Sequence, residues 1–480
     1  MLGNRHIVQK ISLELQLRHA QNALSLQQQC AGLIKNDLVK SMDNFLDTSF
    51  PAGEIYRIPK IEIELGDITA ADIEKNFVAK CMEAFIKTLK QNGRIEQPVQ
   101  PLGEIKKIDR DEYLIGQLFY FMSEGRIEYS STAVDFEEWE QQILQSIKNK
   151  IGIFQQRLAQ LIMKEAGSLD RLLLQFDDNF ISELVAILDP GVKTAFEKLL
   201  ALIKKEMSFT EALHLKTKLF SLIVMQQEYK TGINPGTSFS PQYQHDEIRQ
   251  LLNKVRHKGI IKEMLIAVAD QIGITTSMQG NDEQYYKEKP AINAEEVLLR
   301  ASTKEPAVNE ENSSMFIDNA GVILLHPFLE AFFTAAGLMD KGNFTDNGSR
   351  ERAVHLLQFL VLGRQQMPEY MLQLNKILCG VNAEMHINRF TELNEQEIKE
   401  ALVLLEAVIE HWPALKNTSA AALQETFLQR RAKLSFNSTD KYWKLQVEKK
   451  AVDILLNKLP WGYAYIKLPW MEYPLITDWE

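Results

Sequence analysis

Three histidines stand in apolar surroundings, where an imidazole could serve as a general base or a metal ligand. His326 lies in an apolar run directly before a proline, His355 lies within an apolar helical pattern, and His411 precedes Trp412 at a helix end. None of the three has a second His or Cys at metal-ligand spacing on the same element. We therefore favour a structural histidine, held by a hydrogen bond, over a ligand or a base at each position.

Paired carboxylates are the other candidates for acid–base chemistry. Glu137-Glu138 and Asp177-Asp178 are adjacent in sequence, so on a helix their side chains splay about 100° apart and do not converge. The sequence also lacks a Gly-rich phosphate loop, a nucleophile elbow, an HExxH helix and an EF-hand loop. It therefore predicts a protein that is not an enzyme and has no cofactor or metal, unless the fold brings distant carboxylates or histidines together in a cleft.

Charge and cysteine content narrow the class of protein further. The net charge of −10 argues against a nucleic-acid binder, because phosphate binding needs an excess of Lys and Arg. Within Arg430–Lys467, however, nine Lys and Arg face three Asp and Glu, and we favour a solvated basic face over a patch for an acidic protein partner. Cys30, Cys81 and Cys379 are too scattered for a disulfide framework, so buried thiols in a reducing compartment are expected. Residues 1–10 show no signal-peptide pattern.

The length of 480 residues predicts two to four domains, and 45% hydrophobic with 25% charged residues is typical of folded proteins. Changes in pattern suggest four parts: a β-α-β unit at 1–66, a helical region at 67–231, a linker-rich segment at 232–314 and a C-terminal α+β domain at 315–480. The linkers are the polar stretches 232–244 and 275–313, which contain few large apolar residues. The fold class expected is mainly α with small β elements at both ends.

The N-terminal part combines two alternating segments with a helical one. Ile11–Leu17 and Ile58–Leu65 alternate apolar and polar residues, which is the period of a half-buried strand. Ala20–Phe45, between them, has helical spacing. From Asp67 onward apolar residues recur at three and four residue steps. The helices expected there are Glu112–Ser123, Phe136–Ala166, Leu169–Leu188, Lys193–Lys204, Phe209–Glu228 and Asp246–Ile272.

The most apolar run, Gly321–Met339, contains His326, Pro327 and Glu330. It is barely long enough to cross a bilayer, so a buried segment broken at the proline is favoured over a membrane helix.

The clearest helix is Asn394–Trp412. Asn394 is placed to cap it with Glu397 reaching back, and Pro413 ends it. Further helices are expected at Glu351–Leu362, Met371–Leu378, Thr418–Arg431 and Ala451–Leu459, with a β-hairpin formed by Leu434–Phe436 and Trp443–Val447.

The last forty residues are rich in tryptophan and contain Leu-Pro-Trp twice, ending at Trp461 and Trp470. Trp and Tyr supply large apolar area with one polar group each, so this tail is either a packed end domain or a docking surface. We expect Trp443 and Trp461 to be mostly buried and Met471–Glu480 to be the part that meets a partner.

The pattern L-x-x-F-x-x-x-G-R occurs at Leu118–Arg126 and again at Leu356–Arg364. In both copies the glycine is suited to the left-handed position that ends a helix. Chance explains the match better than duplication, because only four residues are fixed.

Several segments of the C-terminal third resemble one known family in order and spacing. They are NAGVILLHPFL at Asn319–Leu329, RAVHLLQFL at Arg352–Leu360, LNKILCG at Leu374–Gly380, EAVIEHWPALKNTS at Glu406–Ser419, LQETFLQRRAKL at Leu423–Leu434 and LPWGYAYIKLPWM at Leu459–Met471. The chain is therefore similar to the tape measure proteins of bacterial contractile injection systems, and the opening segments HIVQKISLEL and IPKIEIELGDI resemble that family's first two strands. The residues that carry the resemblance or the predicted structure are Asn319, Gly321, His326, Pro327, His355, Asn375, Gly380, His411, Trp412, Pro413, Pro460, Trp461, Pro469 and Trp470.

The resemblance implies an assembly factor that sets tube and sheath length, with no catalytic residues. Its partners would be tube, baseplate and cap proteins, with no nucleic acid and no membrane span. The protein would be cytoplasmic during assembly, or inside the particle. A scaffold, a chaperone or an adaptor for cargo or cap in the same apparatus is the alternative, because Pro and Gly breaks argue for a compact chain.

Overall fold

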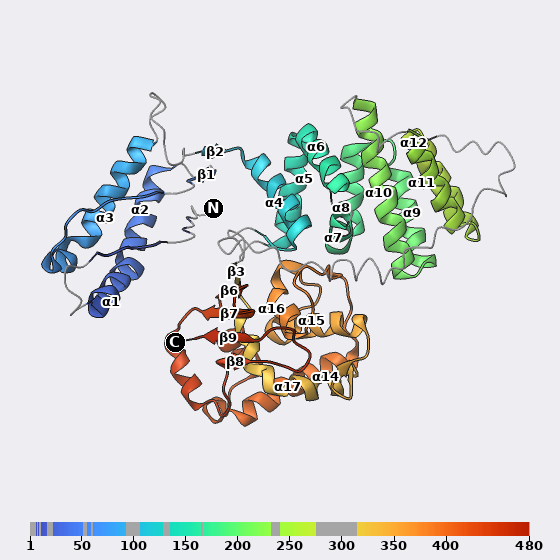
Figure 1. Ribbon diagram of the computed structural model, residues 1–480. Helices are drawn as coiled ribbons and strands as arrows, with labels where there is room; N and C mark the ends of the chain where they lie inside the picture. The colour runs from blue at the N-terminus through green and yellow to red at the C-terminus, as the bar shows by residue number, and fades with distance from the viewer. Residues whose placement is uncertain are drawn as a thin grey trace. The chain divides into compact units, whose positions relative to one another are not determined.

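The computed structural model describes residues 6, 8, 11–16, 23–50, 55–58, 61–92, 106–127, 135–164, 167–231, 241–274 and 314–479. The chain divides into two compact units, Met1–Leu114 and Ile115–Glu480. Helices predominate in both, and small sheets complete them, so the predicted mainly α class is confirmed (Figure 1). The finer domain boundaries at 66, 231 and 314 remain a prediction.

The first unit packs helices around a small core of its own. Its elements are α1 (Ala23–Leu33), the π-helix η2 (Ile34–Leu38), α2 (Val39–Ser49), β1 (Ile55–Arg57), α3 (Ala70–Asn92) and β2 (Lys106–Ile108), and α4 (Arg110–Glu124) begins within it. Cys30, Phe77 and Cys81 are buried together in that core. The two thiols thus serve as small apolar groups, and burial raises the pKa of each.

The predicted strands of a β-α-β unit, Ile11–Leu17 and Ile58–Leu65, are wrong within the described residues. Residues 11–16 and 61–65 belong to no strand, whereas β1 pairs antiparallel with β2. Leu15 and Leu65 pack against the core formed by the helices. Ile11 and Leu13, by contrast, are exposed. Among the described residues, no neighbouring backbone pairs with either segment to form a sheet.

The second unit begins with a run of short helices. They are α5 (Phe136–Asn149), α6 (Ile151–Lys164), α7 (Ser168–Gln175), α8 (Asp178–Leu188), α9 (Lys193–Glu206), α10 (Phe209–Thr231), α11 (Pro241–Lys254) and α12 (Gly259–Ile272). We call residues 115–274 the helical segment. The helix α10 contacts α6, α7, α8, α9 and α11, which gives the segment a continuous apolar core.

Three predicted helices are each two helices in the structure. Backbone angles leave the helical region at Lys150 (φ −130°), at Phe176 (ψ 146°) and at Lys258 (φ −111°). These breaks let successive helices turn and bury their apolar faces against different neighbours, which a periodic pattern alone does not show. The predicted linker 232–244 is shorter than expected, because Pro241 already starts α11, as proline at a first helical position often does. Residues 232–240 and the linker 275–313 lie outside the described residues.

The remainder of the second unit, residues 314–479, we call the C-terminal segment. Its elements are β3 (Met315–Ile317), the 3₁₀-helix η4 (Ala320–Phe328), α14 (Leu329–Ala335), β4 (Met339–Asp340), β5 (Asn343–Phe344), α15 (Asn347–Leu362), η5 (Glu369–Met371), α16 (Gln373–Leu378), α17 (Glu395–His411), η6 (Pro413–Leu415), α18 (Ala420–Leu423), η7 (Gln424–Leu428), β6 (Ala432–Asn437), β7 (Tyr442–Val447), η8 (Ala451–Lys458), β8 (Tyr465–Ile466) and β9 (Leu475–Asp478). Figure 1 shows helices around its sheet.

That sheet has the strand order β3-β6-β7-β9-β8. The predicted hairpin is β6 and β7, with Leu434 opposite Leu445. The last strand, β9, runs parallel to β7 and antiparallel to β8. The strand β9 lies inside the sheet and alternates buried with exposed residues. That Met471–Glu480 meets a partner stays a prediction.

The run Gly321–Met339 buries nearly all of its large apolar side chains, and the boundary between η4 and α14 follows the proline closely. Residues 322–325 of η4 are among the most buried of the chain, and Pro327 closes η4 before α14 begins at Leu329. None of the helices among the described residues combines the length and the apolar character that crossing a bilayer requires.

Candidate functional site

Most residues singled out from the sequence have structural partners, and they are spread over several elements. His355 is buried with Nε2 2.9 Å from the Asn388 carbonyl oxygen, and burial lowers the pKa of its imidazole to about 4. The Nδ1 atom of His326 lies 2.9 Å from the Ile323 carbonyl, and that of His411 lies 2.8 Å from the Ala407 carbonyl. Each of the three imidazoles thus has a backbone carbonyl oxygen within hydrogen-bond distance.

Two asparagines from the same set do meet. The Asn319 side chain donates to Gln358 Oε1 at 2.9 Å and to Asn375 Oδ1 at 3.0 Å. Asn375 in turn donates to Gln358 Oε1 and to the Val354 carbonyl. This buried group of amides joins the start of η4 to α15 and α16.

Both Leu-Pro-Trp motifs place the indole of their tryptophan against the backbone of a helix. Trp461 donates its indole N–H to the Leu324 carbonyl at 2.9 Å, and Trp470 donates to the Leu378 carbonyl at 2.8 Å. The prolines that precede them, Pro460 and Pro469, are exposed. Each motif thus ties the tail to the backbone of a core helix, and Trp461 is partly buried, as is Trp443.

The glycines of the set mark close backbone contacts. A Cβ atom at Gly321 would lie 1.7 Å from the Phe427 carbonyl oxygen, and one at Gly380 would lie 2.1 Å from the Trp470 carbonyl oxygen. Gly380 also has φ +65°, which favours glycine. Trp412 is fully buried and packs on Phe427 with ring centroids 4.7 Å apart. Pro413 follows it in η6, outside the helix that it ends.

The basic stretch Arg430–Lys467 is not simply a solvated face. Arg430 is fully buried, forms an ion pair with Asp453 through two N–O contacts of 2.5 and 2.8 Å, and lies over the Trp479 ring. Arg430, the first residue of the stretch, is therefore part of the packing of the tail, whereas Arg431 beside it is exposed.

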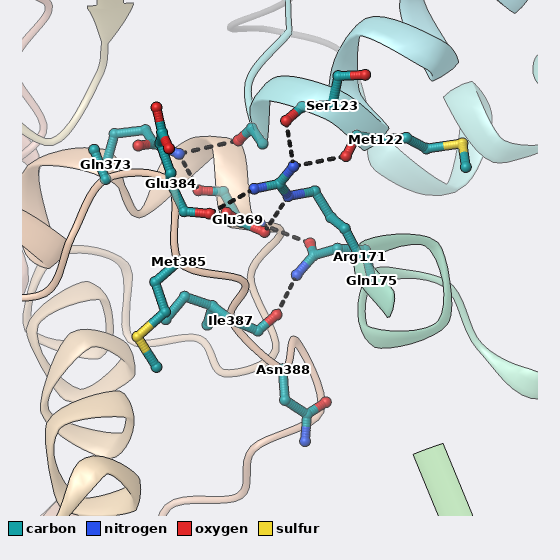
Figure 2. A network of polar contacts seen from close by, with 12 residues as sticks. Met122, Ser123, Arg171, Gln175, Glu369, Gln373, Glu384, Met385, Ile387 and Asn388 are labelled. Atoms are coloured by element: carbon teal, nitrogen blue, oxygen red, sulfur yellow. Dashed lines mark hydrogen bonds and ion pairs between the residues drawn. The ribbon is translucent and has the colours of Figure 1, made fainter. Parts of the chain in front are cut away.

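A network of polar contacts between side chains and backbone, which sequence patterns did not indicate, joins the helical and C-terminal segments (Figure 2). We call it the junction, and its members are Met122, Ser123, Gly125, Arg171, Gln175, Glu369, Gln373, Lys376, Glu384, Met385 and Ile387. Arg171, Glu369 and Lys376 take part with their charged side chains, whereas Glu384 takes part with its backbone carbonyl.

Arg171, from α7, is the centre of the junction. Its Nε donates to Glu369 Oε2 at 3.1 Å, and its Nη1 donates to the carbonyls of Met122 and Ser123 at 2.6 and 2.7 Å. Its Nη2 donates to the Glu384 carbonyl at 2.9 Å. One guanidinium thus holds α4 and two parts of the C-terminal segment together.

Glu369 is the anion between two cations. Lys376 Nζ lies 2.5 Å from Glu369 Oε1, and both side chains are fully buried. Burial opposes ionisation of Glu369, but Arg171 and Lys376 outweigh it and hold the pKa of the carboxyl below its ordinary value. Burial also lowers the pKa of Lys376. The attraction is strong here because the site excludes water.

The first copy of the L-x-x-F-x-x-x-G-R pattern ends at the junction. Gly125 has φ +66° after α4 and Gly363 has φ +63° after α15, so both glycines end helices as predicted. At Gly125 a Cβ would lie 2.5 Å from Glu369 Oε1, and its carbonyl accepts from Gln373 Nε2 at 3.0 Å. The glycine therefore also makes room for the ion pair.

The contacts of the junction connect two segments of the chain. Every charged group of the junction has a partner of opposite charge or a backbone carbonyl, so the described geometry holds segments together and presents no open pair of acid and base. Within the described residues, no three His, Cys, Asp or Glu side chains are grouped as a metal site would require.

The second unit thus consists of a helical segment and a C-terminal segment, which the Arg171–Glu369 and Arg389–Glu140 ion pairs join. A sequence model of the family described as contractile injection system tape measure protein matches residues 5–479. The chain therefore belongs to this family, and the match includes the middle region that lies between the resembling segments. No curated protein and no solved structure matches the chain.

Proposed function

We propose that the chain is a non-enzymatic assembly factor that sets the length of tube and sheath in a contractile injection system. The observation that carries the proposal is the family match over residues 5–479, which includes the long helical segment as well as both ends. Its partners are then the tube, baseplate and cap proteins of the apparatus.

A ruler mechanism requires the chain to be extended while it acts. The longest described helices, α3 and α10, have 23 residues each, which corresponds to about 35 Å. A single helix of the whole chain would reach about 720 Å. A ruler would therefore have to open its folded contacts inside the growing tube.

The junction favours the competing function of a scaffold, chaperone or adaptor. Arg171 and Glu369 are 198 positions apart in sequence and join the helical to the C-terminal segment. A protein that works in this folded-back form would guide assembly or connect components without measuring length by its own extension.

The two functions predict different tube lengths when residues 281–310 are deleted in frame. These thirty residues lie between the two segments, so no described core residue is removed. A ruler gives tubes shorter by roughly 45 Å if this stretch is helical and by up to about 100 Å if it is fully extended. An unchanged length distribution by electron microscopy would exclude the ruler and favour the scaffold.

A matched control keeps the length and scrambles the sequence of residues 281–310. It must leave tube length unchanged under the ruler mechanism, because only the number of residues counts. Stoichiometric presence of the chain at one end of purified mature particles would instead favour the adaptor.

A further inference from the structure

One irregular stretch of the C-terminal segment, Ala383–Arg389, forms backbone hydrogen bonds with the helical segment. We call this stretch the strap. The Glu384 carbonyl accepts from Arg171 Nη2 at 2.9 Å, and the Ile387 carbonyl accepts from Gln175 Nε2 at 2.6 Å (Figure 2). The Arg389 backbone N–H donates to the Leu174 carbonyl at 3.0 Å. The end of α7 thus recognises the main chain of the strap.

The strap is held in shape from its other side by the segment to which it belongs. Lys376 Nζ donates to the Ala383 and Met385 carbonyls at 3.0 and 2.6 Å, while it also pairs with Glu369. Lys376, Glu369 and the strap all belong to the C-terminal segment. That segment therefore presents a preformed surface, a carboxylate beside ordered carbonyls, to Arg171.

Side contacts strengthen the same interface. The Arg389 guanidinium donates to Glu140 Oε1 at 3.1 Å and lies 4.3 Å from the centre of the Phe136 ring. The Glu369 backbone N–H donates to Gln175 Oε1 at 2.8 Å. Each of these contacts runs between the helical segment and the C-terminal segment. The same contacts would therefore form if the two segments belonged to two different copies of the chain.

The covalent connection between the two sides is long. Residues 275–313 join them, which is thirty-nine residues, and a chain of that length can span up to about 130 Å. When an interface has all its contacts between two segments joined by a long connection, a second copy can supply one side without losing any contact. Exchange then costs little in enthalpy.

We propose that the junction is exchangeable between copies, so that α7 of one copy binds the strap and Glu369 of another. A second copy is the partner that fits, because it supplies the buried carboxylate that Arg171 needs as well as the carbonyls. A partner without that carboxylate would leave a buried guanidinium without its counter-ion, at a large cost.

Concentration decides which form prevails. Linked segments meet at effective concentrations in the millimolar range, so a dilute chain closes on itself as a monomer. Exchange becomes competitive where many copies are gathered together, or where closure within one chain is blocked. The inference concerns the purified chain and stands independently of the proposed role in tube length.

Two charge-reversed variants test the proposal. Arg171→Glu reverses the charge on the helical side of the junction, and Glu369→Arg reverses it on the C-terminal side. Neither variant can therefore form the native ion pair within one copy of the chain. When the two are mixed in equal amounts, the Arg171 side of one copy can bind the Glu369 side of the other. A 1:1 heterodimer is expected by light scattering after size exclusion. Two folded variants that stay monomeric on mixing would overturn the proposal.

The controls separate exchange from misfolding. Circular dichroism must show that each variant is folded, and Arg171→Met with Glu369→Gln replaces the pair if it is not. The partly exposed pair Lys193 and Glu183, 2.6 Å apart within the helical segment, gives matched charge reversals that should not dimerise when mixed. Wild-type chain refolded near millimolar concentration should yield dimers that persist on dilution, and recovery of monomer alone would also contradict exchange.

Discussion

The helical and C-terminal segments contain the same kinds of ion pairs and glycines, but these residues differ in how deeply they are buried. Lys193 and Glu183 form an ion pair of 2.6 Å in the helical segment, with about a third of each side chain exposed. Lys376 and Glu369 form one of 2.5 Å in the C-terminal segment with neither side chain exposed. The N–O distances of the two pairs are nearly equal, so the pairs differ in their exposure to solvent. A buried charge needs its partner because water cannot replace it, so loss of one member should destabilise the second pair more.

Glycine shows the same contrast. Gly152 in α6 has open space where a side chain would stand, whereas Gly321 in η4 touches the backbone at Phe427. The helical segment relies on repeated side-chain packing along amphipathic helices. The C-terminal segment also relies on close contacts between backbones, which leave no room for a side chain at glycine positions such as Gly321.

The largest effect is expected for the buried lysine. Lys376→Met removes one of the two cations beside Glu369 and leaves three carbonyl and carboxylate acceptors without their donor. We expect a loss of about 3–5 kcal/mol in the free energy of unfolding, as for other broken buried pairs. Urea unfolding of the whole chain measures it.

The matched change in the helical segment is Lys193→Met. Because that pair is partly exposed, its removal should change the free energy of unfolding far less than Lys376→Met does. Equal losses for the two methionine variants would mean that burial does not distinguish the two segments.

A smaller effect is expected for the glycines. Gly321→Ala should cost about 3 kcal/mol, because the new methyl group meets the Phe427 carbonyl and the backbone must move. Gly152→Ala should be neutral or stabilise by up to about 1 kcal/mol, because alanine favours the helix. Thermal melts of both variants, compared with wild type, decide the matter, and a tolerated Gly321→Ala would contradict the close contact.

A further effect is a dependence of stability on pH, to which Glu351 of the C-terminal segment contributes. Burial raises the pKa of Glu351 from 4.5 to about 7, and its carboxylate accepts from the Asn388 backbone N–H. The folded state therefore binds a proton that the unfolded chain releases. This contribution is fully present below pH 4.5 and is lost as the pH rises through about 7, by up to about 3 kcal/mol.

Glu351→Gln should flatten that part of the stability curve without removing it all, because burial also raises the pKa of Glu140 to about 7. On the acid side the sign is reversed for His355. Its contribution is present above pH 6.5 and is lost as the pH falls through about 4. Melting temperatures across the pH range show both, and an unchanged slope for Glu351→Gln would show that this carboxyl does not titrate with folding.

Local features could be predicted from the sequence because the residues that cause them are neighbours along the chain. Asn394 caps α17, and Glu397 reaches back to it, as their spacing indicated. Gly125 and Gly363 end helices in the left-handed conformation. The β6–β7 hairpin and the family resemblance are of the same kind, since both depend on short stretches in a fixed order.

Only the tertiary structure decided what distant residues do. Alternating patterns at Ile11–Leu17 and Ile58–Leu65 indicated strands, but whether a strand forms depends on a backbone partner that lies elsewhere. In the same way, Arg171 and Glu369 look like ordinary surface residues in the sequence. They become a buried ion pair because two helices and a strap, up to 213 positions apart, enclose them and exclude water.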